Sequence, residues 1–236
     1  MIENVDLIPE EINDNRKRLF DQSWQWLLQN VPVPMRDRWV VFEAGQGLYG
    51  WSDLYKKYFR KVIGADIKDC SAYHPGVESI IADLCKEIPL PDESVDFVVS
   101  HSVLEHLNDL DKALNELDRI LKKGKWAYLT VSPLYFSAKG SHSKTPDPVD
   151  NWEHLDPKSP LYMLTESVEP GPQYLNQLTL SRMLEAVGRL PWSIQQVKIQ
   201  IDERPLPSFL MNSKINETDL RTKGFKILAL KEWHRK

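Results

Sequence analysis

The pattern of apolar and polar positions predicts an α/β domain. Between residues 39 and 131, short apolar runs alternate with stretches of helical periodicity. We expect strands at Val40–Phe42, Val62–Ile67, Ser79–Ala82, Val95–Ser100 and Trp126–Val131. Strands that alternate with helices at this rhythm pair in parallel through right-handed crossovers. The pattern therefore predicts a doubly wound, mostly parallel sheet.

Helices are predicted on both sides of these strands. An N-terminal capping helix is expected because four apolar side chains fall on one helical face: Phe20, Trp24, Leu27 and Leu28. The clearest predicted helix carries the apolar stripe Leu110, Leu114, Leu117 and Leu121. Asp109 is expected to cap its start and Gly124 to end it. A later helix is expected at 178–187 with Thr179 as its cap, followed by strands at Ile194–Ile201 and Phe225–Leu230.

The texture of the chain changes between residues 133 and 175. Seven of the 16 prolines lie there, among many polar residues. A stretch this long with little regular structure is uncommon in a compact domain unless it is a lid or a binding loop. We therefore expect a Pro-rich substrate lid, with a surface insertion of no consequence as the alternative.

Composition and charge narrow the classes of partner. Thirty Lys and Arg against 34 Asp and Glu leave a net charge of -4, which provides no basic field for a nucleic acid. Met1–Glu11 lacks the basic flank and apolar run of a signal peptide, and no segment has the length of a membrane span, so we expect a cytoplasmic location. Two cysteines, Cys70 and Cys85, are too few for a disulfide framework or a usual zinc site, so no metal is expected.

A glycine-rich segment follows the first predicted strand. It reads Glu43-Ala44-Gly45-Gln46-Gly47-Leu48-Tyr49-Gly50, and its glycines let the backbone turn sharply against a ligand. Asp66 ends the next strand, where a carboxylate can accept both hydroxyls of an adenosine ribose. Nicotinamide cofactors and S-adenosylmethionine both carry that ribose, and the literal G-x-G-x-x-G spacing also fits the former. This segment alone leaves both cofactors open.

Further motifs carry a resemblance to a known family. Glu43 stands two residues before the first glycine, and Ala82-Asp83-Leu84 closes the third predicted strand. Pro91–Ser100 then leads into Val103–Leu107, and Arg119–Gly124 is similar to a helix ending written R-x-L-K-P-G-G. Residues 39–132 thereby resemble the class I S-adenosylmethionine-dependent methyltransferases, in particular the type 11 group typified by ubiquinone and menaquinone biosynthesis enzymes.

The resemblance implies a fold, a cofactor and a set of contacts. The implied fold is a seven-stranded Rossmann-like sheet with an antiparallel last strand, and the implied cofactor is S-adenosyl-L-methionine. Glu43 is expected near the methionyl amine and Asp83 near the adenine amine. The implied cofactor-binding residues are Glu43, Ala44, Gly45, Gln46, Gly47, Asp66, Ile67, Asp83, Leu84, Ser100 and His101.

The chain is then expected to form a single methyltransferase domain. It divides into an N-terminal helical cap (1–36), a cofactor-binding core (37–132), the lid (133–175) and a C-terminal helix with a strand pair (176–236).

Two departures from the family pattern keep alternatives in view. In the register E-x-G-x-G-x-G the third glycine is Tyr49, and the second glycine after the later helix is Lys125. These departures favour a non-catalytic binding subunit with a methyltransferase fold. The literal glycine spacing favours an NAD(P)-dependent oxidoreductase. The leading expectation remains a methyltransferase that acts on a small molecule or glycan, at a hydroxyl.

Methyl transfer from a sulfonium requires the protein mainly to align the acceptor and exclude water, and a general base helps when the acceptor is a hydroxyl. His101 ranks first as that base because it follows the fourth strand, and His142 and His154 lie in the lid. A structural hydrogen bond is the alternative for each, and His106 is expected to be structural. Aromatic residues of the same region form an acceptor wall or, alternatively, fasten the loop: Tyr135, Phe136, Trp152, Tyr162 and Tyr174.

Overall fold

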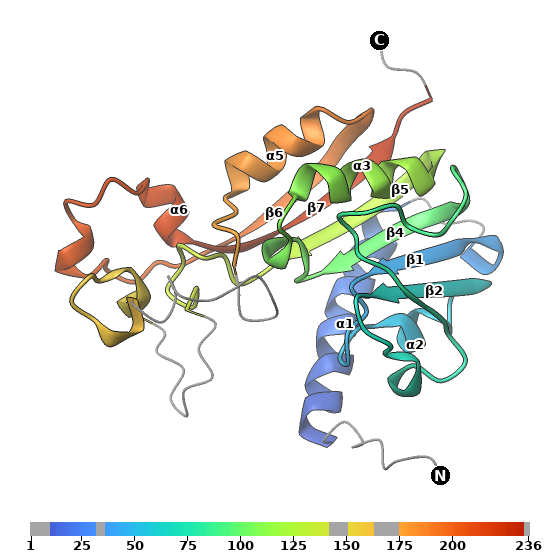
Figure 1. Ribbon diagram of the computed structural model, residues 1–236, viewed down its shortest axis with the longest axis horizontal. Helices are drawn as coiled ribbons and strands as arrows, with labels where there is room; N and C mark the ends of the chain where they lie inside the picture. The colour runs from blue at the N-terminus through green and yellow to red at the C-terminus, as the bar shows by residue number, and fades with distance from the viewer. Residues whose placement is uncertain (1–9, 32–35, 142–150, 163–174, 234–236) are drawn as a thin grey trace.

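One seven-stranded sheet organises the chain, in the order β3-β2-β1-β4-β5-β7-β6 (Figure 1). The computed structural model describes residues 10–31, 36–141, 151–162 and 175–233. The strands are β1 Val40–Ala44, β2 Lys61–Asp66, β3 Glu78–Ile81, β4 Val95–His101, β5 Leu121–Val131, β6 Trp192–Ile201 and β7 Thr222–Lys231. β1 to β5 pair in parallel, whereas β7 is antiparallel to both β5 and β6. The predicted doubly wound sheet with an antiparallel last strand is confirmed.

Helices cover both faces of the sheet (Figure 1). α1 (Glu10–Asn30) and the short α2 (Ser52–Tyr55) pack on one face, which we call the α1 face. α3 (Leu110–Ile120) and α5 (Leu180–Gly188) pack on the other. The remaining short elements are α6 Glu217–Arg221 and the 3₁₀ turns Arg36–Arg38, Ser71–Tyr73, Leu104–His106, Glu153–Leu155 and Ser208–Leu210.

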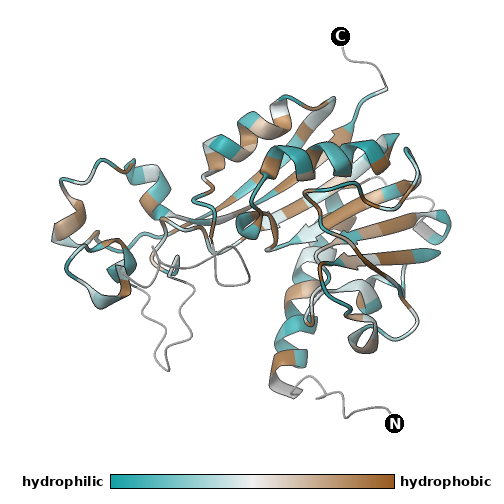
Figure 2. Cartoon of the chain, in the orientation of Figure 1, coloured by the Kyte–Doolittle hydropathy of each residue, from teal (hydrophilic) through white to brown (hydrophobic). Residues whose placement is uncertain are grey.

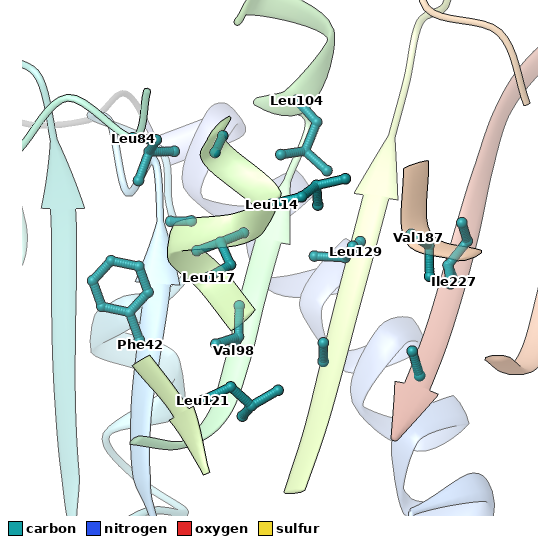
Figure 3. Close-up of a cluster of buried hydrophobic side chains, with 14 of the residues drawn as sticks. Phe42, Leu84, Val98, Leu104, Leu114, Leu117, Leu121, Leu129, Val187 and Ile227 are labelled. Atoms are coloured by element: carbon teal, nitrogen blue, oxygen red, sulfur yellow. The ribbon is translucent and has the colours of Figure 1, made fainter. Parts of the chain in front are cut away.

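The larger core lies between the sheet and α3 (Figure 3). Leu114 and Leu117 of α3 lie over Phe42, Val98 and Leu129, which are fully buried strand residues. Burying one such side chain contributes about 1.5–3 kcal/mol. The outward surface of α3 is hydrophilic and the central strands are hydrophobic (Figure 2). Leu110, Leu114 and Leu117 of the predicted apolar stripe are confirmed as the face of α3 that packs on the sheet, whereas the fourth member, Leu121, is buried as the first residue of β5.

Aromatic side chains fill the core of the α1 face. Phe20 and Trp24 of α1 are buried, as the helical periodicity predicts. The rings of Trp24 and Tyr58 have centroids 4.4 Å apart, and those of Phe20 and Tyr55 lie edge to face at 5.1 Å. These contacts attach the N-terminal helix to the segment that follows β1.

The helix caps and one helix end can be compared directly with the sequence predictions. The Asp109 carboxylate accepts the Lys112 N–H at 3.0 Å and the Thr179 hydroxyl accepts the Arg182 N–H at 3.2 Å, so both caps are confirmed. The prediction that Gly124 ends α3 is wrong, because α3 ends at Ile120 and Leu121 already pairs with Val95 of β4. Pairing of β5 with β4 therefore ends the helix before the chain reaches Gly124.

The described parts of the Pro-rich segment pack beside residues 202–221. The Trp152 ring is buried, and its indole N–H donates to the Leu220 carbonyl at 2.9 Å. Ala138 and Leu210 complete this small cluster. Trp152 therefore fastens the segment to the chain that precedes β7. His142 and Tyr174 lie outside the described residues.

Candidate active site

The glycine turn after β1 is held in a left-handed backbone conformation by its surroundings. Gly45 has φ +73° and Gly47 has φ +48°, values that favour glycine. The N–H groups of Gly45 and Gln46 both donate to the Ala65 carbonyl, at 2.8 and 2.9 Å. A Cβ on Gly45 would lie 2.3 Å from a methyl carbon of Val103. Sterics and backbone conformation thus both require glycine at position 45.

Asp66 joins the end of β2 to this turn. One carboxylate oxygen accepts the Gly47 N–H at 3.0 Å, and the other accepts the Lys68 N–H at 3.2 Å. The neighbouring Ile67 side chain is 60% exposed. The carboxylate is therefore held at the carboxyl edge of the sheet, with its backbone partners fixed and solvent nearby.

Glu43 lies beneath the turn and is completely buried. Its carboxylate accepts the Trp51 N–H at 2.7 Å and the Ser52 hydroxyl. Burial raises the pKa of Glu43, although these hydrogen bonds and the charges of His74 and Arg16 oppose the shift. Glu43 thereby fixes the chain that leads from the glycine turn into α2.

A charged network that sequence reasoning missed holds the outer half of the turn. The buried Arg16 side chain of α1 donates to the Gly50 carbonyl at 2.6 Å and pairs with Asp53. The completely buried His74 donates to the Gly47 carbonyl at 2.9 Å and faces Asp53 at 3.4 Å. Burial works to raise the pKa of Asp53, but hydrogen bonds from His74 and Arg16 lower it to about 2. The carboxylate in turn holds the pKa of His74 above its usual value, against the effect of burial.

Asp83 and Gln46 occupy different environments. The Asp83 carboxylate follows β3, accepts the Cys85 N–H at 2.9 Å and stays partly exposed. Leu84 next to it is buried in the core. The Gln46 side chain points inward, where its amide donates to the Ser79 hydroxyl at 2.9 Å, so that only its backbone belongs to the turn.

The end of β4 carries Ser100 and His101. The Ser100 hydroxyl is buried and has no hydrogen-bond partner among the described residues. The His101 ring lies 3.9 Å from the Trp51 ring centroid and accepts the Tyr55 hydroxyl at Nε2, at 2.9 Å. Burial, with a smaller effect of Lys226, lowers the pKa of His101 to about 3. His101 is therefore neutral at physiological pH.

This pKa gives a direct expectation for a histidine titration. The Cε1–H resonance of His101, assigned with the variant His101→Phe, is expected to stay unchanged from pH 4.5 to 8, because the imidazole remains neutral throughout. Two-dimensional NMR on the wild-type protein measures it. A midpoint above pH 5 would contradict the buried, neutral state.

His154 of the Pro-rich segment is completely buried. Its Nε2–H donates to the Tyr135 carbonyl at 2.6 Å, and its Nδ1 has no partner among the described residues. Burial lowers the pKa of His154. The described contact of this side chain is thus with the backbone of its own segment.

The two departures from the family pattern lie in different places. Tyr49 is half exposed on the glycine turn, where its carbonyl accepts Arg16 Nε at 3.2 Å. Lys125 lies at the amino end of β5, where it pairs with Asp96 at 3.2 Å and lies over the Trp39 ring. Because β4 and β5 are parallel, Lys125 is at the opposite edge of the sheet from the glycine turn.

Two features are absent from the described residues. Within residues 10–31, 36–141, 151–162 and 175–233, no three His, Cys, Asp or Glu side chains gather closely enough to hold a metal ion. None of the helices described there combines the length and apolar character needed to cross a bilayer.

Known proteins are similar to this chain in the region that contains the glycine turn. The family described as a methyltransferase domain matches residues 42–129. A probable S-adenosylmethionine-dependent methyltransferase of Mycolicibacterium smegmatis is 39% identical over 89 residues, which cover 36% of this chain and 34% of the relative. A malonyl acyl-carrier-protein O-methyltransferase of Yersinia pestis is 25% identical over 63% of this chain and 60% of its own length. The matched part spans about a third of the length of the first of these relatives.

Solved structures share the whole fold at low sequence identity. A geranyl diphosphate C-methyltransferase from Streptomyces coelicolor, solved with Mg²⁺, geranyl diphosphate and S-adenosyl-L-homocysteine, has a TM-score of 0.60 and 14% identity. The match covers 95% of this chain and 86% of that one. At this identity the likeness concerns the fold.

Proposed function

We propose that this protein transfers a methyl group from S-adenosyl-L-methionine to an acceptor, because residues 42–129 match the methyltransferase-domain family. We further propose that the acceptor is a small molecule or glycan that is methylated at a hydroxyl. The observation that carries it is the glycine turn, held open against the Asp66 carboxylate.

The residues of this turn fit an adenosyl cofactor. A Cβ built on Gly47 would meet no atom closer than the Asp66 carboxylate at 3.9 Å, so an atom can lie against this side of the turn without a clash. Asp66 retains acceptor capacity for ribose hydroxyls beyond its two backbone bonds. We assign Asp83 to the adenine amine, and the Gly45–Gly47 backbone with Glu43 below it to the methionyl end.

In this reaction the residues of the chain have two tasks, which are to exclude water and to accept a proton. When bound, the cofactor supplies an electrophilic methyl group on a sulfonium. The aromatic residues Trp51 and Tyr55 exclude water beside His101. The His101 imidazole is neutral, and we assign it as the acceptor of a hydroxyl proton, ahead of His142 and His154. At Nε2 the hydroxyl of the methyl acceptor would take the place of the Tyr55 hydroxyl, which donates there at 2.9 Å.

Calorimetric titration with S-adenosyl-L-homocysteine tests the proposal. We expect the wild-type protein to bind, and Asp66→Ala to weaken binding about 30-fold, because a carboxylate acceptor of two hydroxyls is worth roughly 2 kcal/mol. Asp69→Ala is the matched control, since the exposed Asp69 carboxylate accepts hydrogen bonds from the neighbouring Ser71 and lies outside the turn. Its affinity is expected within twofold of wild type.

This titration and two further measurements separate the alternatives. Absence of binding in the wild-type protein would refute the methyltransferase assignment. A fluorescence response to NADH would instead favour an oxidoreductase, which the G-x-G-x-x-G spacing keeps as the second candidate. Binding of the cofactor product without labelling of any acceptor by a tritiated methyl donor would favour a non-catalytic subunit.

A further inference from the structure

Four polar side chains form a row across the α1 face of the sheet, at its carboxyl edge. His101 of β4 is paired with Thr130 of β5, Thr130 with Lys226 of β7, and Lys226 with Lys198 of β6. Directly paired residues of neighbouring strands point to the same face. The Lys226 ammonium donates to the Ser23 hydroxyl of α1 at 3.1 Å, which identifies that face. We call these four residues the lysine row.

The lysine row begins beside the proposed methyl-donor site. The His101 ring packs at a tilt against the Trp51 ring, and the Trp51 backbone N–H donates to Glu43 beneath the glycine turn. His101 also approaches the Thr130 hydroxyl at 3.4 Å. The lysine row therefore starts next to the glycine turn at His101 and crosses β5 and β7 to Lys198 on β6, at the edge of the sheet. We take this as the side from which an acceptor approaches.

Lys226 is half buried, and no residue that the structure describes is its acidic partner. Among the described residues, neither Lys226 nor Lys198 has a carboxylate within ion-pair distance, and Ser23 is the only polar contact of Lys226. Burial and the charge of Lys198 lower the pKa of Lys226. A buried cation is normally paired, because leaving water is costly for an isolated charge.

Lys231 of the same strand illustrates the normal arrangement. It is more deeply buried than Lys226, and its ammonium pairs with Asp118 at 3.2 Å and donates to the carbonyls of Asp118 and Leu121. The chain thus supplies acceptors around one buried lysine of β7 and leaves the other facing a second cation. An anion from outside the chain would complete the charge balance at Lys226.

We propose that the lysine row binds an anionic group of the methyl acceptor, a carboxylate or a phosphate, with Lys226 as its main contact and Lys198 at the entrance. The acceptor is then an acid or a phosphoester that carries its methylated atom toward His101. The inference rests on the proposed function, because the position of the methyl-donor site determines that the methylated atom of the acceptor lies at the His101 end of the row.

The test uses the full chain saturated with S-adenosyl-L-homocysteine and three small probes. Phenyl phosphate, benzoate and neutral benzyl alcohol are titrated separately, with tryptophan fluorescence and calorimetry as readouts. We expect one or both anionic probes to bind the wild-type protein more tightly than benzyl alcohol. Preference for phenyl phosphate identifies a phosphate acceptor, and preference for benzoate identifies a carboxylate acceptor.

Substitutions in the lysine row test which of its residues bind the anionic probe. Lys226→Met is expected to weaken the anionic probe at least tenfold, and Lys226→Arg to stay within about threefold of wild type because it keeps the charge. Lys198→Met, an exposed substitution that leaves the core intact, is expected to weaken it about threefold. Lys123→Met is the control, since that exposed lysine pairs with Glu93 at the opposite edge of the sheet.

The outcomes separate this inference from the proposed function. If the wild-type protein binds S-adenosyl-L-homocysteine but binds no anionic probe, or binds it equally after Lys226→Met and Lys198→Met, the lysine row is not an anion site while the proposed function stands. If the wild-type protein binds no S-adenosyl-L-homocysteine, the proposed function fails, and the inference that rests on it fails with it.

Discussion

Replacement of Arg16 by methionine is expected to destabilise the protein by about 3 kcal/mol and to weaken S-adenosyl-L-homocysteine binding. Arg16 is buried, and removing one partner of a buried ion pair costs roughly 3–5 kcal/mol because the other charge is left unpaired. We expect the lower end of this range, since the Asp53 side chain is 28% exposed and water can reach it. The loss also frees the carbonyls of Tyr49 and Gly50, so the glycine turn loosens.

Urea unfolding of the variant and the wild type measures the stability change. Arg18→Met is the matched control, because Arg18 is exposed on the same helix and donates to the neighbouring Asn15. Its free energy of unfolding is expected within 0.5 kcal/mol of wild type, as is usual for an exposed site. A change below about 1 kcal/mol for Arg16→Met would show that Asp53 and His74 hold the turn without it.

Glu105→Gln is expected to change how stability depends on pH. Burial raises the pKa of Glu105 to about 8, although hydrogen bonds from its own N–H and from Ser132 oppose the shift. In the unfolded chain this carboxyl ionises near pH 4.5. Between about pH 4.5 and 8 the folded state therefore holds a proton that the unfolded state has lost, and the contribution of Glu105 to stability falls by about 1.4 kcal/mol per pH unit.

A glutamine at this position has no proton to lose. Its amide oxygen can still accept the Ser132 N–H, which Glu105 accepts at 3.0 Å. We expect Glu105→Gln to match wild type near pH 4.5 and to exceed its stability by about 3–4 kcal/mol at pH 8, the gap opening as pH rises. Urea unfolding at pH 5, 6.5 and 8 measures the gap, with the exposed Glu87→Gln as control. A constant difference across these pH values would contradict a protonated Glu105.

The position of Glu105 explains why this carboxyl matters beyond stability. Its carboxylate binds the Ser132 N–H, just before the Pro-rich segment, and its carbonyl accepts the Asn176 N–H, just after it, at 2.8 Å. The Asn176 amide also donates to the carbonyls of Leu104 and Leu107. One 3₁₀ turn after β4 thus ties both ends of the proposed lid to the end of the central sheet.

The local features of this protein follow from the sequence by itself. The order and type of the strands, the buried stripe of α3 and the caps at Asp109 and Thr179 depend on residues a few positions apart. Side-chain periodicity and capping are short-range effects, so a single sequence records them. The glycine turn and Asp66 are likewise readable, because their roles depend on their places at successive strand ends.

Only the tertiary structure decided which charged residues are buried and which residues they contact. Arg16 and Asp53 are 37 positions apart, and His74 is a further 21 positions along, so no motif connects the three. The register of β4, β5, β7 and β6 creates the lysine row, and pairing of Leu121 with Val95, rather than Gly124, sets the end of α3. The pKa values of His101 and Glu105 depend on burial, which packing of distant segments produces. Periodicity determines which face of an element is buried, whereas burial of a charge and its partner depends on which segments meet there.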